Sequence, residues 1–290
     1  MRSLLSVFAV LVLTHAAFAQ SADEKKATLA YLGKLQAKEG GYRTDAKADN
    51  PTIRGTSSCL RAIKYFGGTP TETEATKKFV LSCLDRDTGG FADRPGGKPD
   101  VVVTAVGLMA LVELKVPTEK YEKRAIAFLD ENAKGLEEVR MAAAGLEAIG
   151  KKGEKADAWG KRLMGMKNKD GTYGKGKGLA RDTGSYVACL LRLGGKVADP
   201  DAIVKKLNDE QRDDGAFGKA DVDNSDLETT YRVMRTYHML KSKPAKLKEL
   251  RAFVAKCRND DGGYGVAPGL GSTAGGTYFA SIILHWADEK

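Results

Sequence analysis

The sequence predicts an all-α fold, a single (α/α)6 toroid made of six helical hairpins. Three observations carry the prediction: a glycine–aromatic loop recurs along the chain, an amphipathic helical pattern precedes most of these loops, and a more apolar helical pattern follows. A glycine lies two residues before each loop aromatic, where it is expected to end the preceding helix in the left-handed conformation. The aromatics are Tyr42, Phe91, Tyr173, Phe217 and Tyr264, and the glycines are Gly40, Gly89, Gly171, Gly215 and Gly262.

The outer helix of each hairpin is predicted from apolar residues that recur with helical spacing. Looser versions of this pattern occur over Leu29–Leu35 and Trp159–Met166. A single apolar stripe is typical of a helix that buries one face. The clearest stripe, with i, i+3, i+4 and i+7 spacing, is formed by Leu250, Phe253, Val254 and Cys257.

The inner helix of each hairpin is predicted from a polar residue that starts a largely apolar run. Asp100, Asp182 and Asp226 each follow their loop aromatic by nine residues, and Thr273 does so in the last hairpin. Their side chains are expected to be helix N-caps. A helix that is apolar on most faces must be buried on most faces, so these helices are expected inside the ring. The runs are 101–114, 182–195, 228–240 and 275–286.

The spacing of the loop aromatics indicates one further hairpin that lacks an aromatic. Successive spacings are 49, 82, 44 and 47 residues, so the second is nearly double the others. Residues 119–150 fill this gap with an amphipathic helix, a break at Lys134–Leu136 and a second helix. Six hairpins without polar terminal caps favour a closed ring over an open solenoid. The inner helices would then be parallel, with their N-termini at one mouth.

The segment Met1–Ala19 is predicted to be a removable signal peptide. Arg2 gives a charged start, Leu4–Leu13 an apolar core and Ala17–Ala19 a small-x-small cleavage site. The apolar core is too short to span a bilayer, and no other stretch approaches the length needed. We therefore expect residues 20–290 to be one exported domain, periplasmic or secreted, with no transmembrane segment.

The chain is basic, with 47 Lys and Arg against 38 Asp and Glu and a formal net charge of +9. The basic residues are scattered over polar helix faces, which favours a solvated surface and argues against nucleic-acid binding. A weak attraction to anionic lipid or glycan surfaces stays open.

The four cysteines are too few for a disulfide framework in an exported chain of this length. Cys59 and Cys189 lie in apolar helical runs, and Cys83 and Cys257 lie near helix ends, so each is expected to be a small core residue. One Cys59–Cys83 bridge stays open, because neighbouring antiparallel helices could bring the pair together. No zinc-type spacing of Cys or His occurs, and no metal or other cofactor is predicted.

Three stretches resemble a known family. Phe79–Gly96, FVLSCLDRDTGGFADRPG, resembles the repeat of protein prenyltransferase β subunits, most closely that of the Rab geranylgeranyltransferase. Gln36–Tyr42 and Gln211–Phe217 resemble the related QW repeats of terpene cyclases such as squalene cyclase. As architecture the resemblance covers residues 20–290, and it implies the α/α toroid of that family.

The resemblance also implies where a zinc ion would bind, since the transferases use zinc to activate a cysteine thiol. Its ligands would be an Asp and a Cys at one inner-helix start and a His at the next. Counted from the loop aromatic, they stand nine, eleven and twelve residues on. In the second hairpin these positions hold Asp100, Val102 and Val103, and no other copy offers Cys or His. The zinc site is therefore expected to be absent, although Arg94 keeps one arginine of the family's diphosphate-binding loop.

We therefore expect a non-catalytic, exported toroid that binds an isoprenoid or other apolar ligand, or a protein partner, in its cavity or mouth. Tyr231 and Tyr278 occupy the same repeat position, and an aromatic wall suits an apolar chain; ordinary core packing is their alternative role. The candidate binding residues are Arg54, Arg94, Thr104, Arg140, Tyr186, Tyr231 and Tyr278, with Glu228 among the cavity-facing positions.

Two enzyme classes stay open as alternatives. An active prenyltransferase-like enzyme of the geranylgeranyl transferase type would need acids at the mouth, where the candidates are Asp182, Asp223 and Glu228. Asp223 belongs to Asp221–Asn224, which approaches the Asp-x-Asp-Asp acid of class II cyclases. A carbohydrate-active (α/α)6 enzyme would need two carboxylates roughly 5–10 Å apart, which Asp182 and Glu228 on adjacent inner helices could supply.

Overall fold

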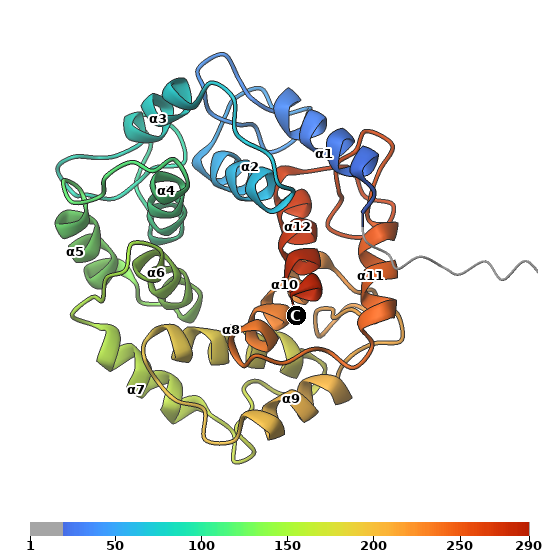
Figure 1. The fold of residues 1–290 in the computed structure, drawn as a ribbon. Helices are drawn as coiled ribbons and strands as arrows, with labels where there is room; N and C mark the ends of the chain where they lie inside the picture. Colours follow the sequence, from blue (N-terminus) through green and yellow to red (C-terminus); the bar gives the residue numbers. More distant parts are fainter. Residues whose placement is uncertain (1–19, 290) are drawn as a thin grey trace, which may run out of the picture.

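The computed structural model describes residues 20–289, in which twelve α-helices form six hairpins (Figure 1). The predicted signal peptide, Met1–Ala19, lies outside the described residues. The outer helices are α1 (Ala22–Lys34), α3 (Thr73–Ser82), α5 (Glu122–Asn132), α7 (Ala156–Met166), α9 (Pro200–Asp209) and α11 (Leu247–Lys256). The inner helices are α2 (Ile53–Tyr65), α4 (Val101–Glu113), α6 (Leu136–Ala148), α8 (Leu179–Arg192), α10 (Leu227–Met239) and α12 (Ala274–Asp288).

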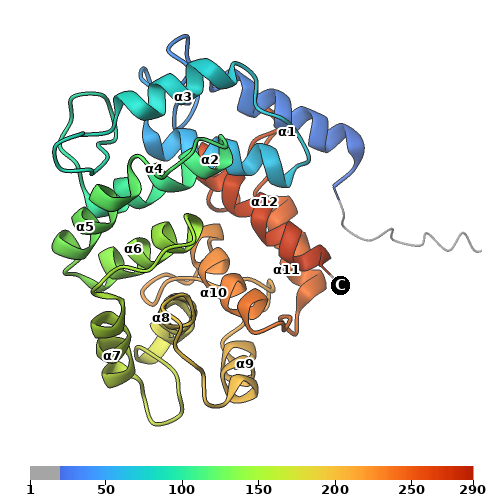
Figure 2. The same cartoon turned by 60° about the vertical axis from the view of Figure 1, so that its left-hand side comes forward.

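The inner helices form a closed ring, because each packs against the next and α12 packs against both α10 and α2. Figures 1 and 2 show the outer helices on the rim and the inner helices around the centre. Inner helix α4 is buried on nearly all faces, whereas outer helix α3 buries only Thr76, Phe79 and Val80. The predicted all-α toroid of six hairpins is confirmed, and the hairpin without a loop aromatic is α5–α6.

The same backbone contact joins neighbouring hairpins and closes the ring. The first amide of α2, at Ile53, donates a hydrogen bond to the carbonyl of Asp93 in the following loop, at 2.9 Å. The first amide of α12, at Ala274, donates likewise to the carbonyl of Thr44 in the first loop, at 2.7 Å. The first amide of α10, at Leu227, makes the same bond to Val266 at 2.8 Å, so the contact that closes the ring is one that two other hairpins also make with their successors.

The side chains of the loop aromatics are buried, and their backbone amides hold the first turns of the inner helices. In each of the five loops the amide N–H of the aromatic donates to a threonine hydroxyl one turn into the inner helix, at 2.9–3.1 Å. This second repeat signal was not recognised in the sequence. The pairs are Tyr42–Thr56, Phe91–Thr104, Tyr173–Thr183, Phe217–Thr230 and Tyr264–Thr277.

The prediction that the loop glycines cap the outer helices is wrong. Gly40 lies six residues beyond the end of α1, and Gly215 lies six residues beyond the end of α9. Both do adopt positive φ, 92° and 78°. Their main role is to let the loop approach the next outer helix: a Cβ on Gly215 would lie 2.2 Å from the backbone nitrogen of Leu250 in α11.

Three of the four predicted N-caps are confirmed. The side chains of Asp100, Asp226 and Thr273 accept hydrogen bonds from the backbone at the starts of α4, α10 and α12. The prediction for Asp182 is wrong, since it is the fourth residue of α8 and not its cap. A 3-10 turn over Gly176–Gly178 starts this helix early, after a loop shorter than the other four loops that carry an aromatic.

All four cysteines are buried and free, so the Cys59–Cys83 bridge that the sequence left open is not formed. Within residues 20–289 no helix combines the length and the apolar character that crossing a membrane requires.

Candidate functional site

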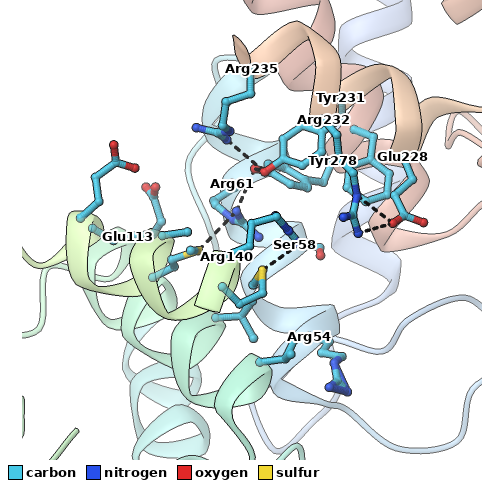
Figure 3. Close-up of a pocket in the computed structure, with 18 of the residues that line it drawn as sticks. Arg54, Ser58, Arg61, Glu113, Arg140, Glu228, Tyr231, Arg232, Arg235 and Tyr278 are labelled. Atoms are coloured by element: carbon cyan, nitrogen blue, oxygen red, sulfur yellow. Dashed lines mark hydrogen bonds and ion pairs between the residues drawn. The ribbon is translucent and has the colours of Figure 1, made fainter. Parts of the chain in front are cut away.

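The centre of the ring is a cavity of about 550 Å³ that all six inner helices line. It extends from first-turn residues such as Arg54 and Glu228 to last-turn residues such as Tyr65 and Arg192. Figure 3 shows lining side chains, among them Arg54, Arg140 and Glu228, that come from several helices. The volume falls within the usual range for small-molecule sites.

One wall of the cavity is apolar. Helix α4 presents Val102, Val106 and Met109 to the cavity with helical spacing, and α6 adds Met141 and Ala144. The facing wall is aromatic and carries the tyrosines at the shared repeat position. Its rings are Tyr231, Tyr278 and Phe279, with centroids 5.0–5.6 Å apart.

The mouth end of the cavity is crossed by a network of charges. Arg232 donates to Glu137 at 3.0 and 3.1 Å and to Glu228 at 2.7 and 3.2 Å. Arg140 also binds Glu137, at 2.6 and 2.9 Å, and Arg181 lies 3.3 Å from Glu228. Both carboxylates of this network are therefore shared between arginines.

The network keeps Glu137 and Glu228 ionised. Burial raises the pKa of Glu137, but the bonds and charges of Arg140 and Arg232 outweigh it and lower the pKa from 4.5 to about 2. Burial also raises the pKa of Glu228, and Arg232 and Arg181 again lower it overall. A glycosidase needs one carboxyl that stays protonated as general acid, and neither of these groups can serve in that way near neutral pH.

Deeper in the cavity, two arginines bracket a pair of tyrosines. Arg61 on α2 donates to the Tyr278 hydroxyl at 2.8 Å, and Arg235 on α10 donates to the Tyr231 hydroxyl at 3.0 Å. The two hydroxyls are 3.5 Å apart. The Arg61 guanidinium lies over the Tyr278 ring, 3.9 Å from its centroid, which fixes it in a cation–π contact.

The arginines create a positive potential at Tyr231. Burial raises the pKa of this hydroxyl, but the charges of Arg235, Arg61 and Arg192 outweigh burial and lower the pKa well below 10. The pKa of Tyr278 is raised, first by burial, so Tyr231 is the hydroxyl of the pair that loses its proton first as the pH rises.

Of the eight residues predicted to bind ligand or face the cavity, five line it. Arg54, Arg140, Glu228, Tyr231 and Tyr278 lie on its wall. Arg94 lines a separate surface pocket beside Phe79. Thr104 is fully buried and holds the Phe91 amide, because the fourth residue of α4 faces the loop. Tyr186 packs edge-on against Tyr173, at 5.7 Å, and does not line the cavity.

The predicted acids do not gather in one place. Glu228 lines the cavity. Asp182, in the first turn of α8, instead lies against Gly174 of the preceding loop, and burial there raises the pKa of its carboxyl group. Asp223 is almost fully exposed, and its nearest cation is Lys177 at 3.7 Å. The carboxylate that does accompany Glu228 is Glu137, which the sequence argument missed.

The other missed residues lie deeper along the inner helices. Arg61 and Arg235 each follow a first-turn cavity residue, Arg54 and Glu228, by seven residues, which is about two helical turns. That spacing on the same helix face was the available signal. The missed residues at this depth include Arg61, Arg192 and Arg235, whereas Glu137 and Arg232, also missed, belong to the network at the mouth.

The positions that zinc ligands would occupy hold other groups. The Asp100 carboxylate accepts a hydrogen bond from the Val103 amide at 2.7 Å as a helix cap. Val102 lines the cavity, and Val103 is fully buried in the core. Among residues 20–289, no three or more His, Cys, Asp or Glu side chains lie close enough together to hold a metal ion.

Known sequences share features with this chain. The model of the prenyltransferase alpha-alpha toroid domain matches residues 2–69, 53–129 and 118–290. A probable geranylgeranyl transferase type-2 subunit beta from Caenorhabditis elegans is 54% identical over 37 residues, which is 13% of this chain and 11% of that protein. The aligned segment thus spans about a tenth of that relative's length.

Two solved structures share the fold. Protein geranylgeranyltransferase-I from Candida albicans, complexed with GGPP, superposes with a TM-score of 0.62 at 14% identity, over 80% of this chain and 83% of that one. A variant of the type II terpene cyclase MstE from Scytonema, in complex with geranylgeranyl dihydroxybenzoate, superposes with a TM-score of 0.65 at 10% identity, over 92% and 96%. At these identities the likeness concerns the fold.

Proposed function

The chain belongs to the prenyltransferase alpha-alpha toroid family, and on that premise we propose that it is an exported toroid that binds an isoprenoid or other apolar chain in its central cavity. In this proposal the zinc-dependent chemistry of the transferases is lost. The observation that carries it is the continuous apolar face of α4 opposite the aromatic wall of Tyr231, Tyr278 and Phe279.

Two features support an isoprenoid as the ligand. The cavity has a volume of about 550 Å³ and is lined along α4 by Val102, Val106 and Met109, which gives an apolar chain a continuous surface to contact. The two solved relatives carry geranylgeranyl compounds, GGPP in one and geranylgeranyl dihydroxybenzoate in the other.

The loss of zinc chemistry is supported by the residues at the inner-helix starts. Val102 and Val103 have no lone pair to offer a metal, and the Asp100 carboxylate is engaged as a helix cap. These residues do not fit a zinc ion. If the chain is an enzyme, it is a prenyltransferase-like transferase that works with other groups.

Export is proposed from the charged start, apolar core and small-residue cleavage site of Met1–Ala19. Fractionation of the host with an antibody against the chain tests this part. We expect a band in the exported fraction that begins near Gln20 by N-terminal sequencing; an uncleaved cytoplasmic band would refute it.

Ligand binding is tested with farnesol, a neutral isoprenoid, by isothermal titration calorimetry on residues 20–290. The wild-type chain is expected to bind. Met109→Trp, which places an indole in the cavity, is expected to abolish binding, whereas Met166→Trp on the exposed face of α7 is expected to leave it intact. The proposal fails if farnesol does not bind, or if both variants bind equally well.

The chemistry is tested by metal analysis and a prenyl-transfer assay on the same preparation. Stoichiometric, tightly held zinc together with transfer of a prenyl group to a cysteine peptide would overturn the non-catalytic assignment.

A further inference from the structure

The interior of the cavity holds two arginines, Arg61 and Arg235, for which residues 20–289 supply no carboxylate partner. The other cavity arginines are paired: Arg54 with Asp93 and Asp100, Arg140 and Arg232 with Glu137, and Arg192 with Glu147. Within residues 20–289, neither Arg61 nor Arg235 forms a salt bridge; their side-chain partners are Tyr278, Met109 and Tyr231.

Both guanidinium groups have donors to spare. A guanidinium carries five N–H donors, and Arg235 uses one of them, on the Tyr231 hydroxyl. The Nε of Arg235 is buried and finds no hydrogen-bond partner among the residues that the structure describes. Arg61 donates to the Ser57 carbonyl through Nε and to Tyr278 and the Met109 sulfur through Nη1, and its Nη2 has no acceptor within residues 20–289. Donors left unpaired in a partly buried site favour an acceptor from outside the chain.

The surrounding aromatic side chains hold the two arginines in place. The Arg61 guanidinium lies 3.9 Å from the Tyr278 ring centroid, and the Arg235 guanidinium lies 4.7 Å from that of Trp286. The two tyrosine hydroxyls connect the arginines: Arg61 lies 2.8 Å from the Tyr278 hydroxyl, and Arg235 lies 3.0 Å from the Tyr231 hydroxyl. The two hydroxyls are 3.5 Å apart. Figure 3 shows Arg61, Tyr278, Tyr231 and Arg235 together on one side of the cavity.

We propose that Arg61 and Arg235, with the hydroxyls of Tyr231 and Tyr278, bind the oxyanion of an amphipathic ligand, a carboxylate or a phosphate whose apolar chain lies along α4 and α6. The site is about two helical turns, roughly 10 Å, inside the mouth. It is distinct from the inner-helix starts around Asp100 and from the surface pocket of Arg94. The oxyanion accepts charge-assisted hydrogen bonds from both guanidinium groups, which are stronger than bonds between neutral groups.

The inference rests on the proposed function for the apolar chain, and a matched ligand series separates the two. Farnesol, farnesoic acid and farnesyl diphosphate share one chain and differ only in the head group, which is neutral, a carboxylate or a diphosphate. Isothermal titration calorimetry on residues 20–290 measures each affinity. We expect at least one of the two anions to bind about tenfold or more tightly than farnesol, the effect of one charge-assisted bond.

Arg61→Gln and Arg235→Gln are each expected to remove the preference for the anion and to leave the affinity for farnesol within about twofold. The matched control is Arg251→Gln on outer helix α11, an arginine that is also half-buried and that pairs with Asp288 outside the cavity. If a glutamine variant does not fold, Arg61→Lys and Arg235→Lys retain the charge and are expected to keep part of the preference.

The inference is overturned if wild-type protein binds all three compounds equally, or if both glutamine variants keep the preference. If inorganic pyrophosphate binds in an arginine-dependent way while farnesol does not bind, the oxyanion site stands and the apolar function fails. If farnesol binds and the head group has no effect on affinity, the apolar function stands and the oxyanion site fails.

Discussion

Arg232 on α10 binds Glu137 on α6 at 3.0 and 3.1 Å, although α8 stands between these two helices in the ring. The contact is possible because α8 carries small residues at this level. A Cβ on Gly184 would lie 2.8 Å from the Cα of Val233, and the Ser185 hydroxyl lies 3.5 Å from Arg232. The arginine thus ties three consecutive inner helices together at the mouth.

Replacing Arg232 by Met is expected to lower the free energy of unfolding by about 2 kcal/mol. The change leaves Glu228 with Arg181 alone and removes one arginine from Glu137, but the half-exposed Glu137 carboxylate can recruit water. Urea unfolding followed by circular dichroism measures the loss. Lys152→Met, which breaks an exposed pair with Asp157, is the control and should cost at most about 0.5 kcal/mol. Equal effects of the two changes would contradict this role for Arg232.

Stability is expected to fall as the pH is lowered from about 5 toward 2. The pKa of Glu137 is about 2 in the folded chain against an ordinary value of 4.5, so between these values the unfolded chain binds more protons. The stability that the ionised Glu137 carboxylate adds to the folded chain is therefore fully present above pH 4.5 and is lost as the pH falls through about 2. In Glu137→Gln, the melting temperature should depend less steeply on pH in this window. An unchanged slope would show that Glu137 is not held ionised by the arginines.

Tyr231 is expected to ionise at lower pH than the other tyrosines. Burial opposes its ionisation, but Arg235 on the same helix, Arg61 on α2 and Arg192 on α8 face the hydroxyl and outweigh it. Other titratable groups that act on this cluster are Tyr278 on α12, Glu147 on α6 and Tyr65 on α2. As the pH is raised in a near-ultraviolet titration, the tyrosinate absorption that appears at the lowest pH should be missing in Tyr231→Phe. In the wild type, saturation with farnesoic acid should weaken the same absorption. A first band that survives in Tyr231→Phe would contradict the assignment.

Gly215→Ala is expected to destabilise the ring strongly, by about 3 kcal/mol or more. An alanine pays about 1–2 kcal/mol for the left-handed φ of 78°, and its Cβ would also meet the Leu250 backbone at 2.2 Å. Gly269→Ala is a matched control, with a φ of 79° and open space around the added carbon. It should therefore lower stability only by the penalty of about 1–2 kcal/mol for the left-handed φ. Thermal unfolding of the two variants separates the costs; similar melting temperatures would show that the close approach to α11 is unimportant.

The helices of the ring could be predicted from the sequence because their burial is periodic. The apolar run of α4 and the shared repeat position of Tyr231 and Tyr278 both translate directly into an inward face. Asp182 could not be placed correctly, because its role depends on a 3-10 turn that starts α8 early. That depends on the conformation of one loop, which the spacing of residues does not determine.

The charged residues of the cavity escaped the sequence argument for a different reason. An arginine two turns into a helix, such as Arg61 or Arg235, has the pattern of a solvent-exposed residue until the ring is closed. The pair of Arg232 and Glu137 joins residues 95 positions apart and leaves no local signal. Such contacts follow only from the full arrangement of inner helices.

The central claim, that the cavity binds an apolar chain, is tested most directly by native mass spectrometry of the protein isolated from the exported fraction of its own host. The wild-type chain should carry a non-covalently bound lipid of isoprenoid size, and Met109→Trp from the same host should be free of it because the indole fills the cavity. A wild-type chain at its bare mass, or the same lipid retained in Met109→Trp, would contradict the claim.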